Sequence, residues 1–152
     1  MSKTILLVDD DAGERELVLI GLRGGGCPQE NVLVAEDGPS ALEKLFSASE
    51  PPALVLLDLN LPGMHGFEVL ERIRADERTR RQPVVILSTS GEDRDRAAAY
   101  DLGANGFVRK PDDFVQFTRV IRELERYWLN VNLPPPARVP ASRASGPGRR
   151  TA

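Results

Sequence analysis

Charged side chains directly follow several apolar runs of this chain, and their types suggest a site for a cation and an anion. Asp9 and Asp10 follow the first apolar run, Asp58 follows a later one, and Lys110 follows a shorter one. A continuous apolar run of this kind is typical of a strand buried on both faces of a parallel sheet. Because open α/β sheets place their sites at the carboxyl ends of such strands, we expect these groups to share one crevice.

These residue types favour a particular chemistry. Carboxylates packed together repel one another, so at neutral pH they either share protons or hold a cation. Oxygen ligands alone favour Mg²⁺, which also binds phosphate oxygens. Lys110 could pair with a carboxylate and then with a phosphoryl oxygen, to which the Ser88 hydroxyl could also donate. An aspartate can accept a phosphoryl group covalently. Asp58 is the expected nucleophile, because it follows the longest apolar run and lies beside the point where the strand order reverses.

Strand-like runs alternate with helix-like segments five times along the chain. The predicted strands are 4–8, 31–35, 53–57, 83–87 and 106–109. The predicted helices are 11–23, 38–47, 66–75, 92–102 and a long one capped by Asp112 or Asp113. This alternation predicts an α/β fold with helices on both faces of a five-stranded parallel sheet. The expected architecture is a doubly wound, flavodoxin-like domain of strand order 2-1-3-4-5, whose switch point lies between the first and third strands.

The helix faces can also be predicted from apolar spacing. In the first helix, Leu17, Ile20 and Gly24 are expected on one stripe. In the last helix, the apolar face is expected to consist of Phe114, Phe117, Ile121, Leu124 and Trp128.

Composition indicates one globular domain. The chain has 152 residues, of which 41% are hydrophobic and 28% charged, as in ordinary soluble domains. No apolar run approaches the roughly 20 residues of a membrane helix, and the N-terminus lacks a signal-peptide pattern. The single cysteine, Cys27, fits a reducing compartment. We therefore expect a cytoplasmic protein without a membrane partner.

The charge is unevenly distributed between the domain and its tail. Residues 134–152 contain four arginines and no acid, so the net charge of −3 leaves −7 for residues 1–133. Such an acidic body predicts no nucleic-acid partner. The tail is rich in Pro, Ser, Gly and Ala, which predicts a flexible or extended segment. A basic arm that docks on an acidic partner is the alternative. The predicted boundaries are 1–133 for the domain and 134–152 for the tail.

Each candidate residue also has a purely structural interpretation. An acid after a strand is often the N-cap of the next helix, which applies to Asp10 and Asp11. Lys110 precedes a proline, as in many loops, and a serine such as Ser88 often ends a strand as a turn residue. Their joint occurrence, at the right strands and in the right order, favours a functional site.

Four segments resemble the receiver domain of two-component response regulators. They are residues 8–11 (VDDD), 56–66 (LLDLNLPGMHG), 87–90 (LSTS) and 107–111 (FVRKP). The resemblance covers about residues 3–131 and implies that Asp58 accepts a phosphoryl group from a sensor histidine kinase. It further implies that the chain is no enzyme beyond catalysing its own phosphoryl transfer and autodephosphorylation.

The resemblance also implies the roles of the surrounding residues. Mg²⁺ would be bound by Asp9, Asp10, Asp58 and the backbone carbonyl of Asn60. Lys110 would contact the phosphoryl group, Ser88 would be the switch hydroxyl, and Phe107 the switch aromatic. Thr89 stands where many members have alanine, and its larger side chain could narrow access to the phosphoryl site.

The C-terminal segment 125–135 (ERYWLNVNLPP) is similar to a subgroup of single-domain regulators paired with bacterial phytochrome kinases. This similarity implies a bacteriophytochrome as the kinase and a homodimer through the last helix and its extension. The candidate interface residues are Tyr127, Trp128, Leu129, Val131 and Leu133. We expect no second folded domain, so that output would use the receiver surface. A helix that is simply well packed at its end is the alternative interpretation.

Three other functions compete with the phosphorylation switch. A flavodoxin-like cofactor-binding module would need phosphate donors after the first strand, where Asp9, Asp10 and Asp11 would repel a flavin phosphate. An aspartyl phosphatase would need an acid two residues after the nucleophile, where Asn60 stands. A receiver that acts only in protein interaction or dimerisation, without phosphorylation, is the third.

Overall fold

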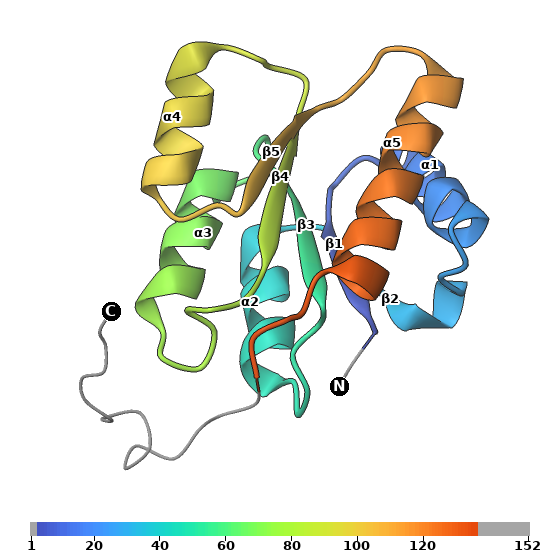
Figure 1. Ribbon diagram of the computed structural model, residues 1–152. Helices are drawn as coiled ribbons and strands as arrows, with labels where there is room; N and C mark the ends of the chain where they lie inside the picture. Colours follow the sequence, from blue (N-terminus) through green and yellow to red (C-terminus); the bar gives the residue numbers. More distant parts are fainter. Residues whose placement is uncertain (1–2, 137–152) are drawn as a thin grey trace, which may run out of the picture.

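The computed structural model describes residues 3–136 and confirms the predicted sheet. Its five strands are parallel, in the order β2-β1-β3-β4-β5 (Figure 1). The strands are β1 (Ile5–Val8), β2 (Val32–Ala35), β3 (Leu54–Asp58), β4 (Val84–Ser88) and β5 (Gly106–Arg109). The predictions made for residues 137–152 of the tail lie outside the described residues. Within residues 3–136, no helix combines the length and apolar character that crossing a membrane requires.

Helices cover both faces of the sheet. They are α1 (Ala12–Gly24), α2 (Gly38–Ser47), α3 (Gly66–Ala75), α4 (Asp93–Asp101) and α5 (Phe114–Arg126), and a short 3₁₀ helix η1 (Gln29–Asn31) precedes β2. Helices α1 and α5 lie on one face, and α2, α3 and α4 on the other (Figure 1). The three central strands are therefore buried along their whole length, as their apolar runs predict, whereas the edge strands β2 and β5 are partly exposed.

Two hydrophobic cores result from the alternation of side chains along each strand. In β1, Leu6 and Val8 point toward α2 and α3, whereas Ile5 and Leu7 point toward α1 and α5. The charged residues at the carboxyl ends of these strands are thus fixed by packing on both sides of the sheet.

Side-chain caps begin two helices where the sequence predicts them. Asp11 accepts a hydrogen bond from the Glu14 backbone N–H at 3.0 Å and caps α1. Asp113, rather than Asp112, caps α5 by accepting from the Gln116 N–H at 2.9 Å. Such caps satisfy backbone donors that a helix start otherwise leaves unpaired.

Two predicted helix faces are wrong in part. Helix α1 buries Val18, Gly21 and Leu22, because its contacts with α5 decide which side faces the sheet. Of the predicted stripe, Leu17 packs partly buried against the same core, whereas Gly24 is exposed. Phe114 is 52% exposed, although it begins the predicted apolar face of α5.

The end of the last helix also differs from the prediction. Helix α5 passes into a π-helical turn, η2 (Tyr127–Val131), which holds more residues per turn and so rotates the side chains relative to an α-helix. Leu129 is therefore buried against the core of the α1 and α5 face, and Trp128 is only partly buried there.

The close packing of α1 on α5 requires a glycine at position 21. A Cβ atom there would lie 2.7 Å from Ile121 Cβ and 2.9 Å from the Thr118 carbonyl oxygen. We expect Gly21→Ala to lower the free energy of unfolding by about 1–3 kcal/mol, because the two helices must move apart. Urea unfolding followed by circular dichroism measures this change.

Gly24→Ala is the matched control in the same helix. Its Cβ would meet only the flexible Arg122 side chain, with Nε at 3.4 Å. We expect stability to be unchanged or raised by up to about 1 kcal/mol, since alanine favours helix. Equal destabilisation by both substitutions would contradict the packing argument.

Candidate functional site

The carboxyl ends of β1 and β3 bring three carboxylates together, as the strand order predicts. One carboxylate oxygen from each of Asp9, Asp10 and Asp58 lies within 4.8 Å of the others. The register aligns Val8 with Leu57, so the residues that follow them are neighbours across the two strands. Asp9 is 1% and Asp58 6% exposed, whereas Asp10 is exposed to solvent.

Lys110 enters this cluster from the end of β5. Its Nζ atom lies 3.3 Å from Asp58 Oδ1 and 4.0 Å from Asp9 Oδ2, and the side chain is buried. Its backbone N–H donates to the Ser88 carbonyl oxygen at 2.7 Å, which fixes the start of the following loop. The sequence therefore correctly predicts that Lys110 joins the carboxylates.

Glu14 is a further member of the cluster that the sequence analysis missed. Its Oε1 atom accepts a hydrogen bond from Lys110 Nζ at 2.6 Å. The only local signal is the spacing of Asp11 and Glu14, which matches a capping box at the start of a helix. In the structure, Asp11 caps the helix while the Glu14 carboxylate contacts Lys110.

The remaining predicted site residues lie on β4, on β5 and in the loop after Asp58, at different depths. The Ser88 hydroxyl is buried at the end of β4 and accepts from the Ser90 N–H at 3.1 Å. Phe107 on β5 is partly buried against the core shared with α2 and α3. Asn60 is exposed, and its N–H donates to Asp58 Oδ1 at 3.4 Å. The roles assigned to these residues remain predictions.

A close backbone approach holds the loop that follows Asp58. A Cβ atom on Gly66 would lie 2.6 Å from the Asp58 carbonyl oxygen and 2.7 Å from Leu59 Cα. The Gly66 N–H donates to the Leu59 carbonyl at 2.8 Å. Only a glycine lets α3 begin this close to the strand, so the loop carrying Asn60 is folded back at a fixed position.

Burial dominates the electrostatics of the two inner carboxylates, Asp9 and Asp58, and Glu14 adds repulsion to both. Burial raises the pKa of Asp9 from 3.8 to about 7, and Glu14 adds to the rise through a side-chain hydrogen bond and its negative charge. The Asp11 N–H and Lys110 act in the opposite direction. Burial likewise raises the pKa of Asp58, although Lys110 and the Asn60 N–H partly offset it.

Lys110 keeps its charge despite its burial. Burial by itself lowers the pKa of this ammonium, but the hydrogen bond to Glu14 and the attraction of Asp58, Glu14 and Asp9 outweigh it, so the pKa is raised. Both partners of the Lys110–Asp58 pair therefore have raised pKa values, for different reasons. Several carboxylates together outweigh the burial of Lys110, whereas the single ammonium does not outweigh the burial of Asp58.

The donor set fits a divalent cation. Three carboxylate oxygens converge within a few ångströms, and together with Glu14 they exceed the single positive charge of Lys110. A hard cation with oxygen ligands would relieve that excess, and an exposed ligand such as Asp10 leaves the site open to water. The cluster can therefore hold a metal ion beside a nucleophilic carboxylate.

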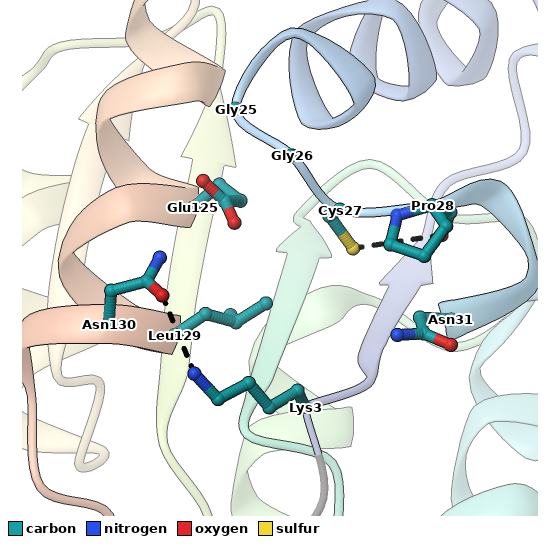
Figure 2. Close-up of a pocket in the computed structure, with 9 residues that line it drawn as sticks. All are labelled: Lys3, Gly25, Gly26, Cys27, Pro28, Asn31, Glu125, Leu129 and Asn130. Carbon is teal, nitrogen blue, oxygen red and sulfur yellow. Dashed lines mark hydrogen bonds between the residues drawn. The ribbon is translucent and has the colours of Figure 1, made fainter.

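A separate pocket lies at the opposite end of the sheet, near the start of β1 (Figure 2). It has a volume of about 150 Å³ and is lined by residues that include Lys3, Glu125, Leu129 and Asn130. Glu125 is buried, and among the described residues its Oε1 atom has no hydrogen-bond partner. Leu129 is the sole predicted site residue in its lining. This pocket is thus distinct from the carboxylate cluster.

Comparison with known proteins places the chain in one family. The chain matches the response regulator receiver domain over residues 5–122. The response regulator Rcp1 of Synechocystis is 35% identical over 138 residues, which are 87% of this chain and 93% of Rcp1. The probable methanogenesis regulatory protein FilR2 of Methanothrix harundinacea is 36% identical over 135 residues, which are 86% of each chain.

Solved structures agree with the sequence matches. The phosphorylated cyanobacterial phytochrome response regulator RcpA has a TM-score of 0.82 at 33% identity, covering 90% of this chain and 100% of RcpA. The Mn²⁺-bound form of Rcp1 has a TM-score of 0.80 at 32% identity, covering 88% of this chain and 99% of that one.

The raised pKa of Asp9 predicts a pH-dependent effect on the metal-free protein. Because the folded-state pKa exceeds the ordinary value of 3.8, the contribution of Asp9 to stability falls as the pH rises toward about 7. In EDTA, Asp9→Asn should therefore raise the free energy of unfolding by about 1–3 kcal/mol at pH 8, and by less at pH 5. Urea unfolding at the two pH values tests this.

Asp10→Asn is the control, because its exposed carboxylate loses little hydration on folding. We expect a smaller change at pH 8 than for Asp9→Asn. A gain of equal size at both pH values for Asp9→Asn would show that ionisation of the carboxyl is not its cause.

Proposed function

This chain is a member of the response regulator receiver domain family, and from that membership we propose that it is a phosphorylation switch whose Asp58 accepts a phosphoryl group from a sensor histidine kinase. Receiver domains are signalling modules rather than enzymes acting on external substrates. The observation that carries the proposal is the position of Asp58, buried at the end of β3 with Lys110 Nζ at 3.3 Å and two further carboxylates beside it.

The proposed transfer needs only groups that the site brings together. A carboxylate oxygen of Asp58 forms a bond to phosphorus as the bond between phosphorus and the histidine nitrogen breaks. The electron pair of the broken bond stays on the imidazole of the kinase histidine. Lys110 contacts the phosphoryl oxygens and stabilises their charge. Asp9, Asp10, Asp58 and the Asn60 carbonyl would hold Mg²⁺. When bound, that ion supplies further charge neutralisation at the phosphoryl oxygens.

We propose that the signal then passes along β4 and β5. Asp58 is paired with Leu87 across β3 and β4, which places the Ser88 hydroxyl next to the acceptor strand. In the next pair, Phe107 is aligned with Ile86 of β4. The Ser88 hydroxyl would donate to the new phosphoryl group, and Phe107 would follow inward, which changes the surface near α4, β5 and α5. Phosphorylation acts here as a ligand that shifts a two-state population.

Phosphorylation can be tested with a small-molecule donor. Incubation with acetyl phosphate and Mg²⁺ should add one phosphoryl group to the wild-type protein, detected by intact-mass spectrometry. Asp58→Asn should remain unmodified because the amide is not a nucleophile, and EDTA should suppress the reaction of the wild type. No modification of the wild type, or equal modification of Asp58→Asn, would refute the proposal.

We also propose a phytochrome-type kinase as the partner. The support is the likeness to RcpA, which is named a phytochrome response regulator and matches over nearly the whole of both chains. Phosphotransfer from a purified bacteriophytochrome kinase, compared with transfer from unrelated histidine kinases of the same source, would test this part of the proposal.

A homodimer through the end of α5 is the third part of the proposal. Val131 is 58% and Leu133 91% exposed, and Tyr127 is also exposed. Trp128 is partly buried beside them, whereas Leu129 is already buried in the core and adds little to such a surface. A group of apolar side chains at one end of a helix favours burial against a second copy.

Leu133→Glu should therefore shift the protein from dimer to monomer in sedimentation equilibrium, because a charge would enter the apolar contact. Leu33→Glu is the control, since Leu33 is another exposed leucine on the edge strand β2. Both proteins should be measured with and without acetyl phosphate. A wild-type monomer under both conditions, or equal dissociation by the control, would exclude this interface.

A further inference from the structure

We infer that Glu14 holds Lys110 in the unphosphorylated protein and thereby slows phosphoryl transfer to Asp58. This inference rests on the proposed phosphorylation of Asp58 and assigns Glu14 as a positioning residue that acts through Lys110. It begins from a contact at the centre of the site that the family motifs in this sequence do not include.

The distances around Lys110 rank its partners. The Nζ atom lies 2.6 Å from Glu14 Oε1, 3.3 Å from Asp58 Oδ1 and 4.0 Å from the nearer oxygen of Asp9. Charge-assisted hydrogen bonds are strongest when they are short. The ammonium therefore gives its best hydrogen bond to Glu14, and the proposed phosphoacceptor receives a longer one.

The first turn of α1 fixes the position of Glu14. The Glu14 backbone N–H donates to the Asp11 side-chain carboxylate at 3.0 Å. The next residue, Arg15, donates from Nη1 to the Asp9 backbone carbonyl at 3.0 Å. The Arg15 side chain thus ties this turn to the strand end that carries Asp9. The Glu14 carboxylate is presented to Lys110 by the same packing that builds the site.

The contact can also be released. The Glu14 side chain is 28% exposed, compared with 8% for Asp58 and 2% for Asp9. Water can therefore hydrate the Glu14 carboxylate when Lys110 turns toward another anion, so loss of this partner leaves no buried charge unpaired. Neither of the two inner carboxylates has this freedom.

During phosphoryl transfer, Glu14 competes with the phosphoryl group for the Lys110 ammonium. With acetyl phosphate, the bond from phosphorus to the acetyl oxygen breaks, acetate leaves with the electron pair, and an Asp58 oxygen bonds to phosphorus. The anionic phosphoryl oxygens need the Lys110 ammonium as this happens. A carboxylate that already binds the ammonium, and that repels the incoming anion, raises the barrier.

The test compares two substitutions that remove the same charge from the same helix. Glu14→Gln keeps the shape of the side chain but weakens its hold on Lys110, whereas Glu16→Gln alters an exposed residue of α1. Under acetyl phosphate and Mg²⁺, the rate constant for phosphorylation should rise about three- to tenfold in Glu14→Gln and stay unchanged in Glu16→Gln.

The Glu14→Gln substitution made in the Lys110→Gln protein separates an effect that acts through Lys110 from a general effect of removing charge. In Lys110→Gln, which reacts slowly, adding Glu14→Gln should produce no further acceleration, because the residue through which Glu14 acts is gone. A purely structural role would instead move the urea unfolding midpoint and leave the rate constant unchanged.

Several outcomes would overturn the inference. They are a Glu14→Gln rate constant equal to or below that of the wild type, an equal acceleration by Glu16→Gln, or the same acceleration in the Lys110→Gln background. If the wild-type protein takes up no phosphoryl group, both the proposed function and this inference are contradicted. If the wild type is phosphorylated but Glu14→Gln is not phosphorylated faster, only this inference is contradicted.

Discussion

The pairing of one ammonium with three carboxylates, beside a fourth, is the interaction on which the arrangement of this molecule depends. Lys110 contacts Asp58, Asp9 and Glu14, and Asp10 completes the acidic group. Burial makes the charges of Asp9 and Asp58 unfavourable, as their raised pKa values indicate, and Glu14 adds repulsion. The rest of the fold must hold the acidic group together, and its excess of negative charge makes the site receptive to a cation and sensitive to a new anion.

The sheet supplies the restraint. Strands β1, β3 and β4 are buried along their whole length, so the residues at their carboxyl ends cannot separate without opening two hydrophobic cores. The backbone contact between Gly66 and Asp58 and the hydrogen bond from Lys110 to Ser88 add local constraints on the loops. Apolar burial on both faces thus stabilises a polar site at the edge that could not persist alone.

The two ends of the sheet carry different kinds of side chain, charged at one end and apolar at the other. The carboxyl end gathers charged groups around Asp58, and a change there can pass through neighbouring positions on β4 and β5. The far end carries the π-helical turn, with Leu129 directed into the core and Val131 and Leu133 directed to solvent. Chemistry and the proposed contact with a second copy therefore occupy separate regions, linked by α5 and the sheet.

What the sequence alone determined was local in origin: apolar runs end at Asp9, Asp58 and Lys110, and strand–helix alternation orders those strands so that their ends meet. The cap by Asp11 follows from neighbouring residues for the same reason. Tertiary packing decided the rest. Glu14 and Lys110 are separated by 96 positions, and their contact exists only because α1 lies where its packing on α5 places it. That packing also selected Val18, Gly21 and Leu22 as the buried face of α1, and the π-helical turn placed Leu129 in the same core, choices that no local pattern encodes.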